Sequence, residues 1–140
     1  MITNKQVVEN WRHGINEHKQ AGHLYHRDGV LYSYGEHYPL AVQVDCVVLI
    51  NSRGYSVTTA AHEALVRRAF ECIDIVYCPN IIGVSRMERP AMKAAIKHNQ
   101  DEKEHLQKLL SRARAYGIIE SYKREIQNLE RALAWLSARL

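Results

Sequence analysis

The dipeptide Asp28-Gly29 lies between two short runs of strand-forming residues, Leu24–Arg27 and Val30–Ser33. A two-residue type I′ turn requires positive φ at both of its central positions, and Asp-Gly is among the pairs that meet this requirement best. The pattern therefore predicts an antiparallel hairpin in which Tyr25 faces Tyr32. A sheet is thus expected in the first half of the chain.

Short apolar runs bounded by turn residues predict further strands at residues 40–44, 46–50 and 55–57. Residues 75–77 and 81–84, separated by Pro79-Asn80, predict one interrupted strand or two short ones. Helical periodicity is expected over residues 3–20, with Thr3 as the cap, and over residues 59–73, with Thr59 as the cap. The predicted apolar faces of these helices comprise Val7, Val8, Trp11 and Ile15 in the first and Leu65, Val66, Ala69, Phe70 and Ile73 in the second.

From Pro90 onward the pattern is helical to the end, and residues 85–88 have the spacing of a capping box. The run at 97–105 is polar on every side, so the sequence leaves helix continuity open there. Gly117 follows a basic stretch and is expected to end the first of two helices. The second helix carries a heptad seam made by Tyr122, Ile126, Leu129, Leu133, Leu136 and Leu140.

A seam of this length is too short to be stable alone, so it should pack against the preceding helix, against a second copy, or both. A homodimer through the seam is the simplest self-association. The expected fold class is α+β: a small antiparallel β-meander packed by helices, followed by a C-terminal antiparallel helical hairpin. The expected domains are residues 1–89 and residues 90–140.

The 140 residues suffice for one domain with its own core, and no apolar run approaches the length of a membrane span. The N-terminus lacks the layout of a signal peptide, and three cysteines are an unusual number for a secreted domain. Reduced, mostly buried thiols in a cytoplasmic protein are therefore expected. The net charge of +4 falls entirely in residues 90–140, which is compatible with nucleic acid but does not require it.

Polar and aromatic residues that could bind a ligand or partner concentrate around the start of the helix expected at Thr59. They are Tyr34, His37, Arg53, Tyr55, Ser56, Thr58, Thr59 and His62. His62 would be the third helical residue, where the helix dipole disfavours a protonated imidazole. Free backbone N–H groups together with Arg53 could hold a phosphate or carboxylate. The alternatives are capping threonines with a surface histidine, or a histidine base that acts on a phosphate-bearing ligand.

Two further candidates lie in the C-terminal helices. His98, Asp101 and His105 share one helical face at a spacing that could hold a divalent metal, although Lys97 and Lys103 would oppose a cation. A solvated polar face is the favoured interpretation, and no metal or cofactor is predicted. Basic residues that could follow a phosphate backbone are Lys108, Arg112, Arg114, Lys123 and Arg124, near Tyr116 and Tyr122. The alternative is a wet helix face with internal ion pairs.

The segments 31–41 (LYSYGEHYPLA) and 55–62 (YSVTTAAH) resemble a family of small uncharacterised proteins encoded by bacteriophages and prophages. Those proteins share a YSYGxHxPxA element followed by a YSxTTxxH element. The resemblance covers about 40 residues and implies a setting, a phage-derived protein in the bacterial cytoplasm, but no activity or cofactor. The leading function is then an accessory protein that binds and inhibits a host or defence component. The alternatives are a nucleic-acid-binding accessory protein and, third, an enzyme.

Overall fold

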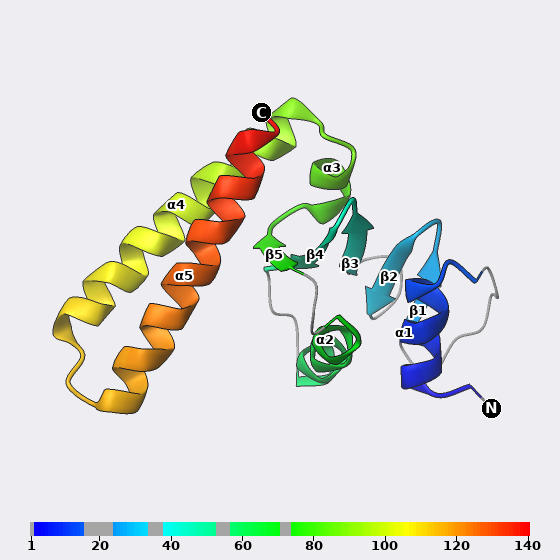
Figure 1. The fold of residues 1–140 in the computed structure, drawn as a ribbon, viewed down its shortest axis with the longest axis horizontal. Helices are drawn as coiled ribbons and strands as arrows, with labels where there is room; N and C mark the ends of the chain where they lie inside the picture. The colour runs from blue at the N-terminus through cyan, green and yellow to red at the C-terminus, as the bar shows by residue number, and fades with distance from the viewer. Residues whose placement is uncertain (1, 16–23, 34–37, 53–56, 71–73) are drawn as a thin grey trace. The chain divides into compact units, whose positions relative to one another are not determined.

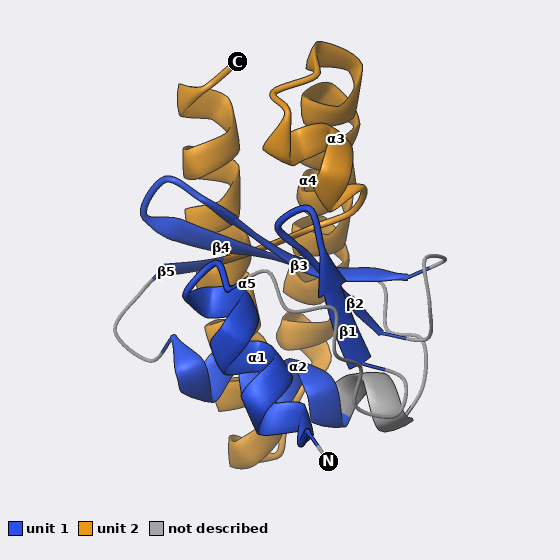
Figure 2. Cartoon of the chain, turned by 90° about the vertical axis from the view of Figure 1, so that its right-hand side faces the viewer, with its two compact units in different colours: residues 1–75 blue, residues 76–140 orange. Residues whose placement is uncertain are grey.

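The structure is a computed structural model, and it describes residues 2–15, 24–33, 38–52, 57–70 and 74–140 (Figure 1). The side chains of residues 57–60 are outside this description. Contacts within the chain define two compact units, residues 1–75 and residues 76–140 (Figure 2). The predicted α+β class is confirmed, whereas the predicted domain boundary after residue 89 stays a prediction.

Within the described residues, five strands form one mixed sheet in the order β1-β2-β3-β4-β5. The strands are β1 (Leu24–Arg27), β2 (Val30–Ser33), β3 (Pro39–Val44), β4 (Val47–Asn51) and β5 (Asp74–Cys78). The first four pair antiparallel as a meander, and Tyr25 lies opposite Tyr32 with the two rings stacked at 5.2 Å between centroids. Asp28 and Gly29 have φ of 52° and 82°, so the expected hairpin turn is confirmed.

Helix α1 (Asn4–Arg12) begins at the predicted Thr3 cap. The cap forms a capping box, in which the Thr3 side chain accepts from the Gln6 amide while the Gln6 side chain accepts from the Thr3 amide. The helix ends earlier than predicted. Gly14 has a φ of 67°, its amide donates to Trp11 O, and the Ile15 amide donates to Asn10 O. These two bonds define a Schellman motif, which stops the helix and leaves Ile15 exposed rather than on the apolar stripe.

Helix α2 (Val57–Ala69) starts at Val57, two residues before the predicted cap, so the expected strand at residue 57 and the Thr59 cap are wrong. Its buried positions are His62, Val66 and Phe70, the last just beyond the helix end. Leu65 and Ala69 are only half-buried, and Ile73 is outside the described residues. Figure 2 shows α1 and α2 side by side along one face of strands β1 to β4.

Two local predictions for the second unit are wrong. Residues 81–84 were expected to be a strand but form the short helix α3 (Ile81–Ser85), whose Asn80 cap adopts a φ of 48° and accepts from the Gly83 amide. The capping box at residues 85–88 does not form, because Ser85 Oγ donates to Ile82 O within α3. Helix α4 (Arg89–Arg112) instead starts after Glu88 without a side-chain cap.

Helix α4 runs without interruption through residues 97–105, and helix α5 (Tyr116–Ala138) returns beside it (Figure 1). The connection is Ala113–Ala115, so Gly117 is the second residue of α5 and not a C-terminal stop. Leu106 of α4 and Ile126, Ala132 and Leu136 of α5 are buried, and Lys103 Nζ lies 3.4 Å from a Glu130 carboxylate oxygen across the two helices. The seam therefore packs within the chain. Its pairing of two copies stays a prediction.

None of the helices in the described ranges has an apolar stretch long enough to cross a membrane.

Candidate functional site

The first predicted site falls largely outside the described part of the chain. Tyr34, His37, Arg53, Tyr55 and Ser56 belong to segments that the structure does not describe. Thr58 and Thr59 are the second and third residues of α2, and only their backbone is described. A partner surface at these residues stays a prediction. The exception is His62, whose surroundings are well defined.

His62 is the sixth residue of α2 rather than the third, and its side chain is 3% exposed. The His62 Nδ1 and Ser33 Oγ atoms lie 2.8 Å apart, within hydrogen-bond distance, and Ser33 is fully buried at the end of β2. The pair ties α2 to the sheet in a place without solvent contact. The prediction of a dipole-tuned histidine at the helix start is therefore wrong, because the helix begins three residues earlier, at Val57 rather than at Ala60.

The sequence contains a pattern that indicates the burial of His62. His62, Val66 and Phe70 are spaced at i, i+4 and i+8, so they occupy one helical face. Nearby, Tyr38 is also buried, and burial together with the Glu63 carboxylate raises the pKa of its hydroxyl above the ordinary value. The Ser33–His62 pair gives two buried polar side chains of the first unit a hydrogen-bond partner, as expected for core residues.

His62→Ala is accordingly expected to destabilise the fold, by about 1–3 kcal/mol, because it opens a cavity and removes the partner of a buried hydroxyl. His105, exposed on α4, provides the matched control, and His105→Ala should change stability by less than about 0.5 kcal/mol. Urea unfolding followed by circular dichroism measures both. Equal stabilities for the two variants would contradict a core role for His62.

The candidate metal ligands do not converge. No group of three or more His, Cys, Asp or Glu side chains in the described ranges is placed to hold a metal ion. Asp101 is instead 3.2 Å from Lys97 Nζ, one turn away, and His105 is exposed. The favoured interpretation of a solvated polar helix face fits this arrangement.

The cysteines differ in their surroundings. Cys46 was expected within a strand and buried, but it lies in the turn between β3 and β4 and is exposed, because Asp45 with a φ of 51° reverses the chain there. Cys78 at the end of β5 is fully buried, and burial raises the pKa of its thiol to about 12. Cys72 is outside the described residues. Both described thiols are free.

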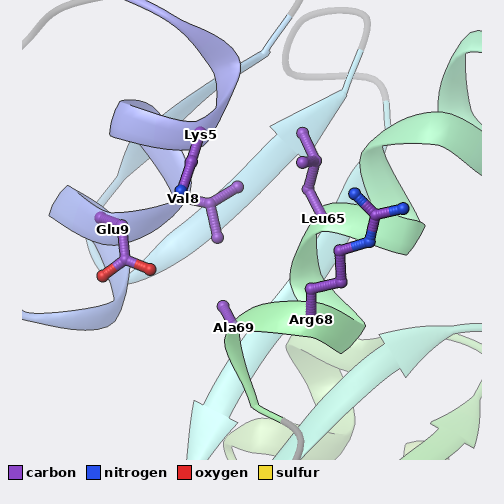
Figure 3. Close-up of a pocket in the computed structure, with 6 residues that line it drawn as sticks. All are labelled: Lys5, Val8, Glu9, Leu65, Arg68 and Ala69. Carbon is purple, nitrogen blue, oxygen red and sulfur yellow. The ribbon is translucent and has the colours of Figure 1, made fainter.

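A groove of about 260 Å³ lies between α1 and α2 (Figure 3). Its lining residues are Lys5, Val8 and Glu9 of α1 and Leu65, Arg68 and Ala69 of α2. The volume is below that of ordinary small-molecule sites. Glu9 also lies 3.3 Å from His13, one turn along the same helix. The groove is best described as the line of contact between two amphipathic helices.

The basic residues of the α4–α5 hairpin differ in their ion pairing. Away from the connection, Lys97 pairs with Asp101 and Lys103 pairs with Glu130. Around the connection, only Lys123 has a carboxylate within 4.0 Å, Glu120 at 3.7 Å. Lys108, Arg112, Arg114 and Arg124 have no ion pair in the described part of the chain and are exposed, as are Arg89, Lys93 and Arg131 farther from the connection. We call residues 106–126 the hairpin tip.

The hairpin tip thus contains all five predicted nucleic-acid-binding residues. Figure 1 shows the α4–α5 connection at the end of the hairpin away from α3. Five basic and two acidic side chains lie between residues 106 and 126, so the tip is strongly positive for its size. Tyr116 and Ile118 are 79% and 50% exposed there. A cationic segment with an exposed aromatic ring is chemically suited to a polyanion.

Comparisons of the chain with protein-family models, with curated proteins and with solved structures found no match.

Proposed function

We propose that the protein acts by binding, and that the hairpin tip binds nucleic acid through its basic side chains. The observation that carries the proposal is the concentration of exposed basic side chains at the hairpin tip, where five basic residues accompany only two acidic ones. Four of the five, Lys108, Arg112, Arg114 and Arg124, have no carboxylate partner among the described residues. Cations without local partners are the groups that exchange small counterions for phosphates.

The start of α5 supports the proposal. Its N-cap is Ala115, which offers no side-chain hydrogen bond, and its first turn contains no acidic residue. The positive end of the helix dipole is therefore not compensated by the protein itself. Arg114 immediately precedes this helix start, so the local field adds to the charge of the arginines.

The proposal also includes where the protein acts and how it associates with itself. The resemblance of residues 31–41 and 55–62 to phage and prophage proteins supports an accessory role in the bacterial cytoplasm. Half-buried Leu129 and Leu133 of α5 support the pairing of two copies along the helical seam. A dimer would present two hairpin tips and raise the apparent affinity for a long polyanion.

The test is the salt dependence of binding to a fluorescently labelled oligonucleotide. Each lost phosphate contact should reduce the slope of log K against log salt by about 0.7 to 0.9, so Arg112→Ala combined with Arg114→Ala should flatten it by about 1.5. Affinity at low salt should fall about 10-fold or more. Both side chains are exposed, so the fold should be unaffected.

The matched control removes two charges elsewhere on the same hairpin. Lys93→Ala combined with Lys97→Ala changes the net charge equally, but these residues lie on α4 away from the tip. The control should retain the slope of the original protein. Equal weakening by both pairs would show that only net charge matters, and binding indifferent to salt would overturn the proposal.

A further inference from the structure

We infer that the hairpin tip is selective for single-stranded over duplex nucleic acid, with Tyr116 as the platform on which an unpaired base stacks. This inference rests on the proposed function and specifies its ligand. It starts from the unusual exposure of one ring. Tyr116 is 79% exposed at the first position of α5.

The other tyrosines of the described ranges are placed differently. Tyr25 and Tyr32 stack on each other, Tyr38 is buried, and Tyr77 and Tyr122 are half-buried. Leaving an aromatic ring in water forfeits its burial energy, about 25 cal/mol for each Å² that remains exposed. Tyr116 is therefore the described tyrosine with the most ring surface free for an external partner.

The residues that precede Tyr116 in the sequence are of kinds that bind a polynucleotide. Arg112 and Arg114 precede it by four and two residues, and neither has an ion pair in the described part of the chain. Ala113 and Ala115 alternate with them and add little bulk beside the ring. A base stacked on Tyr116 would thus carry its phosphates past two free guanidinium groups, which is the usual combination in single-strand binding.

Duplex nucleic acid cannot use this ring in the same way. In a duplex the base faces are already stacked, so a protein reaches only phosphates and the base edges in the grooves. Base-edge readout depends on side chains such as Asn, Gln, Asp and Glu, as well as arginine. Residues 112–118 (RARAYGI) contain none of these four types. Apart from its two arginines, this segment has no side chain of the kinds that read base edges, so it is suited to base faces.

The experiment compares a labelled 20-nucleotide oligo(dT) with a duplex of equal length by fluorescence anisotropy at fixed low salt. The original protein should bind the single strand more tightly than the duplex. Tyr116→Ala should reduce single-strand affinity about 5- to 100-fold, the value of one stacked base, and so lower the ratio of the two affinities. Tyr116→Phe should preserve the ratio, because stacking uses the ring and not the hydroxyl.

The outcomes separate the inference from the proposed function. If the Arg112/Arg114 double variant loses affinity but Tyr116→Ala binds oligo(dT) as the original protein does, the proposed function stands and the stacking role is wrong. A duplex bound as tightly as the single strand would also overturn the inference. If neither nucleic acid binds at low salt, the proposed function fails and the inference fails with it.

Discussion

Trp11→Ala is expected to reduce the free energy of unfolding by about 3–5 kcal/mol, the usual cost of truncating a large buried aromatic residue. Trp11 is 2% exposed, and its ring meets Phe70 edge to face at 5.5 Å between centroids. Its Nε1–H donates to the Gly29 carbonyl oxygen at 2.9 Å. One side chain therefore connects α1, the β1–β2 turn and the end of α2.

Urea unfolding monitored by circular dichroism measures this loss, and Trp11→Phe separates its two causes. Phenylalanine keeps a ring against Phe70 but cannot donate to Gly29, so it should cost less, about 1–2 kcal/mol. If the alanine variant does not fold at all, the phenylalanine variant still tests the hydrogen bond. A cost below about 1 kcal/mol for Trp11→Ala would contradict the central position of this residue.

Gly83→Ala is expected to destabilise the second unit by about 1–3 kcal/mol through overpacking. An added Cβ would lie 2.7 Å from the Ala91 Cβ and 2.8 Å from Asn80 Nδ2. Ala91 is fixed near the start of α4, and Asn80 caps α3 through its bond to the Gly83 amide, so neither can move without losing packing. The strain outweighs the gain of about 0.5–1 kcal/mol that alanine brings to a helix.

Gly117→Ala is the matched control for this substitution. Gly117 is the second residue of α5, its φ is not positive, and an added Cβ would meet nothing within 4 Å. Alanine there should stabilise the protein by up to about 1 kcal/mol, because it restricts the unfolded chain without strain. Thermal unfolding should therefore shift in opposite directions for the two variants. A shift in the same direction would show that the Gly83 contact is unimportant.

Much of the fold could be predicted because short-range rules decide it. The Thr3 cap, the Asp28-Gly29 turn with its Tyr25–Tyr32 pair, and the helical hairpin all follow from residues close together in the sequence. The strand expected at residues 81–84 failed for the opposite reason. A short apolar run fits a strand or a buried helix turn equally well, and here the Asn80 cap and the Ala91 contact select the helix.

Tertiary context also explains what the sequence left open in the C-terminal half. Residues 97–105 are helical although they are polar on every side, and Asn99 is fully buried among them with its amide donating to Tyr77 O. The ion pairs within the hairpin could not be predicted from the sequence either. Lys103 is paired with Glu130 only because α5 returns beside α4, so sequence spacing alone could not separate paired cations from free ones.

His62 lies elsewhere than predicted because of where helix α2 begins. An N-cap at Thr59 would place His62 in the first turn of a helix, whereas a start at Val57 places it one turn deeper, on the face that carries Val66. The residue that looked most reactive is thus part of the core. Nucleic-acid binding by the basic residues stays a prediction, and which of them are unpaired is known only from the structure.

The central claim is that nucleic acid contacts the hairpin tip. Its most direct test is a titration of the ¹⁵N-labelled protein with unlabelled oligo(dT), followed by two-dimensional NMR. We expect the largest changes in amide chemical shift among residues 106–126, with those of Arg114 and Tyr116 prominent, and little change in residues 1–75. Shifts concentrated in the first unit, or no shift at low salt, would contradict the claim.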